Sequence, residues 1–180
     1  MLFVYKDQVG STAFARLQRD GLVHTRLGSV ALPADVPSTR ALRLQLIAPL
    51  VPQHTWLTGL AALWLEGLAP SPSALDLAGP RGTHRTLAVP GSPPLAFHSG
   101  WLWGLPDAPS PRAATVTRAC LDALTHSSVR AALPAVMRAL GAGATSVNDL
   151  VTGVHAIERH SHHRARLDSL VTAIAELRAA

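Results

Sequence analysis

The sequence predicts an α+β fold in which a small helix-and-hairpin unit precedes a mixed region and a C-terminal block of helices. Apolar residues at helical spacing over residues 11–20 are followed at once by two short extended runs. Short apolar runs between proline, glycine and serine turns, the pattern of strands, occupy residues 70–111. Helical spacing returns over residues 117–178 in three or four segments. A chain of 180 residues can hold a small module and a larger one, which we place at residues 1–50 and 51–180.

The predicted first helix has two different sides. A serine or threonine at its start can cap it, and Gly21 follows as a glycine does after a helix end. Its apolar residues share one side, while Arg16 and Arg19, three residues apart, share the other. The sequence therefore predicts an amphipathic helix with a basic outer side.

A β-hairpin is predicted directly after this helix. The runs Leu22–Thr25 and Ser29–Leu32 are the expected strands, and Pro33 closes the unit. Residues 26–28 form the expected turn, which makes Arg26 a basic residue at its tip.

The rest of the chain alternates helical and extended segments. Helices are expected over residues 38–50 and 57–66, and Ser146 with Asp149 resembles a capping box at the start of a later helix. The expected strands are Ala74–Ala78, Thr86–Val89, Leu95–His98 and Trp101–Trp103.

Composition excludes several classes of protein. Sixteen basic residues against 11 acidic ones give a net charge of +5, which permits nucleic-acid binding without establishing it. Cys120 is the single cysteine, so it allows no internal disulfide and no cysteine-based zinc site. No signal peptide stands out, and the longest apolar region, residues 44–68, is interrupted by prolines and polar residues. We therefore expect a soluble cytoplasmic protein that contacts no membrane.

Enzyme motifs do not stand out either. The sequence contains no phosphate-binding loop, dinucleotide fingerprint, nucleophile elbow or paired-carboxylate cluster. We therefore expect no catalytic activity and no cofactor.

Several segments, taken in order, resemble the AbiEi-type antitoxins. The order and spacing of these segments along nearly the whole chain carry the resemblance, because each motif alone is weak. The matching segments are Gly10–Gly28 with the wing strand Gly28–Pro33, Thr58–Leu68 ("S-A-A-x-x-x-G-L" in the family), Leu75–Ala78 with Arg81 ("L-x-V-P-R"), and Thr115–Asp122 ("T-x-x-R-T-x-x-D"). The chain departs from the family at Val30, where an aromatic residue is usual, at Ala119, and in the absence of a nuclease-like C-terminal extension.

The resemblance implies a truncated winged helix in residues 1–50 and a toxin-neutralising or partner-binding domain in residues 51–180. The function that it implies is a bacterial transcriptional regulator, the antitoxin of a type IV toxin–antitoxin system. Such a protein represses its own promoter and counters a nucleotidyltransferase-like toxin.

Four cations are the candidate DNA-binding residues. Arginines on a recognition helix can contact phosphates or guanine edges in a major groove, and a hairpin arginine can follow the backbone or enter the minor groove. A homodimer would double these contacts. The alternative is that they are ordinary solvated charges. The residues are Lys6, Arg16, Arg19 and Arg26.

The candidate partner-binding residues lie in the second region. Arg118 and Asp122, four residues apart, would pair on one helix face, either to recognise a partner or to fix the strands to the first helix structurally. Trp101 and Trp103 would share one strand face, as interface anchors or as core residues.

Histidines cluster near the C-terminus. His155, Glu158 and His162 would share a face, and so could hold zinc, only if one helix ran through Ser161. The sequence favours a basic surface with Ser161 capping the last helix, and we expect no metal site.

Two other functions remain open. One is a protein-interaction module that kept the fold and lost DNA binding, and the other is a nuclease-less relative that works with a separate catalytic subunit.

Overall fold

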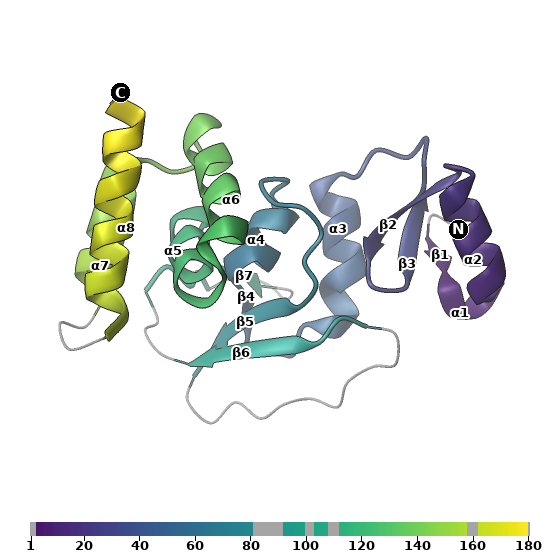
Figure 1. Ribbon diagram of the computed structural model, residues 1–180. Coiled ribbons are helices and arrows are strands. Elements are labelled where there is room, and N and C mark those ends of the chain that lie inside the picture. Colours follow the sequence, from purple (N-terminus) through teal and green to yellow (C-terminus); the bar gives the residue numbers. More distant parts are fainter. Residues whose placement is uncertain (1–2, 81–91, 100–102, 108–111, 158–161, 180) are drawn as a thin grey trace.

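The chain has an α+β fold, seen in a computed structural model that describes residues 3–80, 92–99, 103–107, 112–157 and 162–179 (Figure 1). Within these ranges, the side chains of residues 25, 26, 99, 162 and 179 are not described. The helices are α1 (Lys6–Val9), α2 (Ser11–Arg19), α3 (Arg40–Ile47), the 3-10 helix η1 (Ala48–Leu50), α4 (Gly59–Leu65), α5 (Val116–His126), α6 (Val129–Gly141), α7 (Val147–Ala156) and α8 (His162–Ala179). The strands are β1 (Val4–Tyr5), β2 (Val23–Leu27), β3 (Val30–Pro33), β4 (Trp56–Leu57), β5 (Leu75–Gly79), β6 (Leu95–Ser99) and β7 (Arg112–Ala113).

The N-terminal unit is a three-stranded antiparallel sheet with two helices between its first and second strands. The strand order is β1-β3-β2, and α1 and α2 lie at one end of the molecule, opposite α7 and α8 (Figure 1). Gly10, with φ of 82°, separates α1 from α2, in a backbone conformation that favours glycine. The predicted helix over residues 11–20 is confirmed as α2. The elements β1 and α1 were not predicted.

The hairpin differs from its prediction in register. Strand β2 continues to Leu27, so Arg26 lies within the strand, at a β-bulge, and not at the turn. The turn is Gly28–Ser29, and Gly28 has the positive φ (54°) that such two-residue turns require. Leu27 is only 1% exposed and belongs to the main core, which explains why the strand extends that far.

The second sheet is mixed, with the strand order β6-β5-β4-β7. Strand β4 pairs antiparallel with β5 and parallel with β7, and β5 pairs parallel with β6. The predicted strands Ala74–Ala78 and Leu95–His98 are confirmed within a residue as β5 and β6. Thr86–Val89 and Trp101 lie outside the described residues, and Trp103 lies in a turn, so no strand extends through it.

Two predicted helices are shorter than expected. The helix over residues 38–50 begins at Arg40, with the Thr39 hydroxyl accepting a hydrogen bond from the Leu42 amide, and gives way to η1 before Pro49. The helix over residues 57–66 begins at Gly59, because Leu57 belongs to β4.

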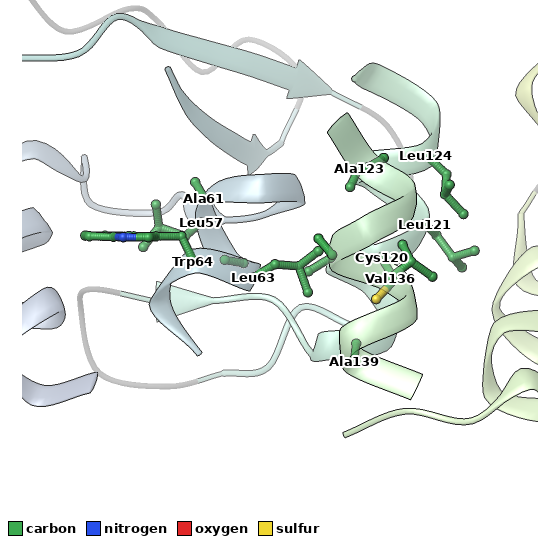
Figure 2. Close-up of a cluster of buried hydrophobic side chains, with 14 of the residues drawn as sticks. Leu57, Ala61, Leu63, Trp64, Cys120, Leu121, Ala123, Leu124, Val136 and Ala139 are labelled. Carbon is green, nitrogen blue, oxygen red and sulfur yellow. The ribbon is translucent and has the colours of Figure 1, made fainter. Parts of the chain in front are cut away.

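The main core lies between the second sheet and the helices above it. Leu63 of α4 points toward α5 and α6, where Cys120 and Val136 are also buried (Figure 2). A separate small cluster of Phe14, Val23 and Ala31 holds α2 on the first sheet. This second cluster fixes which side of α2 faces outward.

The described residues of the C-terminal block form the four helices α5 to α8, in agreement with the three or four segments predicted. The capping box is confirmed: the Ser146 hydroxyl accepts from the Asp149 amide, and the Asp149 carboxylate accepts from the Ser146 amide. None of the helices in the described ranges combines the length and apolar character needed to cross a membrane.

Candidate functional site

The outward side of α2 presents two arginines to solvent. Phe14, which is 4% exposed, and Leu17 pack against the first sheet on the inner side. The side chains of Arg16 and Arg19 are 76% and 74% exposed. With Ser11, Thr12 and Ala15 they line a shallow hollow along the helix. The outer side of α2 is thus polar and basic, with small residues near its N-terminus.

A single carboxylate, that of Asp20, forms ion pairs with both of these arginines. Asp20, at the C-terminus of α2, has Oδ2 3.6 Å from Arg16 Nε and Oδ1 3.3 Å from Arg19 Nε. Exposed pairs of this kind are worth about 0–1 kcal/mol, because solvent screens them. A phosphate group could therefore replace Asp20 as their partner.

The other two predicted DNA contacts lie in or next to the hairpin. Lys6 is exposed, and its backbone amide donates a 2.9 Å hydrogen bond to the Ser29 carbonyl in the hairpin turn. Arg26 lies in β2, and its side chain is outside the described part of the chain. The structure thus brings Arg16 and Arg19 together on α2 and places Lys6 beside the turn that follows β2.

Arg118 and Asp122 do form the predicted pair, on one face of α5, with 2.7 Å between Arg118 Nε and Asp122 Oδ2. Their side chains are only 3% and 1% exposed. A surface recognition point must be accessible to its partner, so this burial favours the structural one of the two roles that the sequence left open for the pair. They act inside the fold.

The pair joins three parts of the second region. The hydroxyl of Thr58, just before α4, donates a hydrogen bond to Asp122 Oδ2. Arg118 Nη1 donates a 2.7 Å hydrogen bond to the Trp103 carbonyl. Burial raises the pKa of the Asp122 carboxyl, while Arg118 and then Thr58 oppose that rise. No described group donates a hydrogen bond to Asp122 Oδ1.

Trp103 is half-buried and packs on the main core. Its ring lies against Gly153 of α7, where an added Cβ would come within 2.8 Å of Trp103 Cη2. This tryptophan therefore holds the turn against α7, which is the core role that the sequence had left open. Trp101 is outside the described residues.

A polar cluster that the sequence did not predict lies where β5, β6, α5 and α8 meet. His98 Nε2 is 3.0 Å from Asp76 Oδ1, and the His98 ring stacks on His126, with centroids 3.9 Å apart and an angle of 7°. The His163 ring meets His126 edge-on at 5.7 Å. Desolvation, followed by the charges of His98 and His163, lowers the pKa of His126 to about 4.

This cluster is not arranged as a metal site. The nitrogen lone pairs of His98 and His126 lie in two parallel, stacked ring planes, so they do not converge on one ion. Over the ranges that the structure describes, no three histidine, cysteine, aspartate or glutamate side chains could hold a metal. Helix α7 ends at Ala156 and Ile157 is extended, so His155 and His162 do not share one continuous helix. Glu158 and Ser161 lie outside the description.

Cys120 is fully buried, and desolvation raises the pKa of its thiol to about 12. Because the thiolate is the reactive form, this cysteine is inert in the folded protein.

A comparison of the sequence with protein-family models finds no match, and a comparison with the curated proteins finds none either. A functional assignment therefore depends on the geometry of the surfaces and on the order of the sequence motifs.

Proposed function

We propose that the chain is a DNA-binding transcriptional regulator whose recognition helix is α2. The observation that carries this proposal is the division of α2 into a buried apolar side and an outer side with two highly exposed arginines. A helix whose inner side is fixed by a sheet can enter a major groove without rearranging.

The surroundings of α2 support the same role. Helix α1 precedes α2 across Gly10, and the β2–β3 hairpin follows it, so a helix pair and a wing lie next to each other in the chain. Ser11 and Thr12 near the start of α2 can donate hydrogen bonds to phosphates. Lys6, beside the hairpin turn, adds a cation on the flank of this surface.

The regulatory role extends the resemblance to AbiEi-type antitoxins. On this proposal the protein binds its own promoter through α2 and the hairpin. Residues 51–180 counter a nucleotidyltransferase-like toxin, and the protein acts in the cytoplasm.

The test is binding of the purified protein to a fluorescent duplex from its own upstream region, titrated against salt. We expect the Arg16→Ala/Arg19→Ala double variant to lose at least about tenfold in affinity, because two phosphate or base contacts disappear. An Arg166→Ala/Arg178→Ala variant is the matched control, because it removes two exposed arginines from α8. Equal binding by wild type and the α2 variant would overturn the proposal.

One observation favours a second candidate, a protein-interaction module that no longer binds DNA. Asp20 contacts both arginines of α2 and partly neutralises them. In that case the wild-type protein would show no affinity for the duplex above that for non-specific competitor DNA.

A further inference from the structure

A groove in the second region carries positive charge on an apolar floor. It has a volume of about 620 Å³, and it runs between α6 and the segment that leads from α4 to β5. Arg130, Pro134 and Arg138 line it from α6, and Leu60, Pro70 and Pro72 line it from the other wall. The size lies within the range of sites that hold a small ligand or a few residues of a peptide.

The position of Arg130 is not explained by the stability of its helix. It is the second residue of α6, after the N-cap Ser128, and the first turn of α6 contains no acidic residue. A cation at this end of a helix is unfavourable, because the helix dipole is positive there. The positive charge of Arg130 thus adds to that of the helix end, and together they favour an anionic ligand at this position.

The two groove arginines have no acidic partner within the part of the chain that the structure describes. None of the ion pairs found there includes Arg130 or Arg138. Arg138 is held in place, because its Nε donates a 2.8 Å hydrogen bond to the Leu68 carbonyl. Its remaining guanidinium nitrogens are available to a ligand, and the side chain stays exposed.

Pro134 contributes an apolar ring to the same wall. It lies inside α6, four residues after Arg130, and has no N–H to donate. The Arg130 carbonyl therefore lacks its usual helical partner. The groove thus combines two cations with an apolar floor that includes Pro134.

We propose that this groove binds an acidic, extended segment of another protein. The carboxylates of the segment would pair with Arg130 and Arg138, and an apolar side chain would contact the proline floor. Eight residues of helix separate the arginines by about 12 Å. An extended chain covers that distance in about four residues. The expected motif therefore has two acidic residues about four apart with an apolar residue between them.

The apolar floor favours a peptide over a nucleic acid. Phosphates would satisfy the two arginines, but a sugar–phosphate backbone offers no apolar side chain for Leu60, Pro70 and Pro134. The surface also lies on α6, apart from α2, so its role is separate from the DNA binding proposed above.

The proposal can be tested by selecting a phage-displayed random peptide library on the wild-type protein, with soluble Arg130→Glu/Arg138→Glu protein as the competitor. We expect enrichment of the acidic motif. The selected peptide, made synthetically, should bind the wild type at least about tenfold more tightly than the charge-reversed variant. Its affinity for the wild type should fall as the salt concentration is raised. Arg166→Glu/Arg178→Glu is the control with the same change in charge, and it should bind like the wild type.

A single variant tests whether the loss of affinity comes from a disturbed fold. Arg130→Glu leaves the Arg138–Leu68 hydrogen bond intact and puts a favourable negative charge at the start of α6, so it should lower the affinity for the peptide while being at least as stable as the wild type. Enrichment of basic or neutral peptides, or equal binding by all variants, would overturn the proposal. Loss of affinity for duplex DNA by Arg130→Glu/Arg138→Glu, with no acidic peptide selected, would assign the groove to nucleic acid instead.

Discussion

Arg118 and Asp122 form an ion pair, 2.7 Å from Nε to Oδ2, in the interior of the second region. The pair connects α5 to the residue that precedes α4 and to the Trp103 turn. Its burial makes it a structural element, since neither charge can reach another molecule without opening of the fold.

Breaking this pair on one side should destabilise the protein strongly. Asp122→Leu leaves the Arg118 charge buried without its partner, and we expect a loss of about 3–5 kcal/mol in the free energy of unfolding. The double variant Arg118→Met/Asp122→Leu removes both charges and should cost less than the sum of the two single variants. Urea unfolding of Arg118→Met, Asp122→Leu and the double variant measures this coupling. Additive losses would show that the two side chains act independently.

The histidine cluster makes stability depend on pH. The pKa of His126 is lowered to about 4 in the folded protein from an ordinary 6.5, so the unfolded chain binds more protons between these values. The free energy of unfolding should therefore fall as the pH falls from about 6.5 to 4. The His126 side chain keeps part of its surface in solvent, which screens its charge, so we expect a loss of about 1 kcal/mol. When urea unfolding is compared at both ends of this pH window, the His126→Gln variant should lose less of its free energy of unfolding than the wild type. An identical pH dependence in both proteins would contradict the account.

Gly153 brings the backbone of α7 close to the side chains of Leu121 and Trp103. A Cβ there would lie 2.6 Å from Leu121 Cδ1 and 2.8 Å from Trp103 Cη2. We expect Gly153→Ala to cost about 1–3 kcal/mol, because both neighbours are packed against the core. Gly141→Ala is the matched control, since a Cβ there meets nothing within 4 Å. Thermal unfolding distinguishes them, and equal melting temperatures would refute the close packing.

Local sequence signals predicted the regular elements well. Helix α2 followed from its apolar spacing and from Gly21, and the start of α7 followed from the Ser146–Asp149 capping box. Both signals act within a few residues, where propensity and capping decide the structure. The elements β1 and α1 were missed, because two to four residues give no measurable period.

The site residues were harder to predict, because tertiary contacts decide them. The spacing of Arg118 and Asp122 predicted their pairing correctly, but not their burial, which depends on how α4 and the Trp103 turn pack over α5. The contact of His98 with His126 joins β6 to the end of α5. No periodicity in the sequence connects such distant residues.

The central claim is that α2 binds DNA, and the Asp20 carboxylate offers its most direct test. Asp20→Asn removes the competitor of Arg16 and Arg19, so this variant should bind the promoter duplex more tightly than the wild type. Arg16→Ala/Arg19→Ala should bind more weakly, and its slope of log affinity against log salt should be reduced by about two. An order of affinity with Asp20→Asn first, wild type second and the double variant last is the result that we predict. The same affinity and salt slope for all three proteins would contradict it.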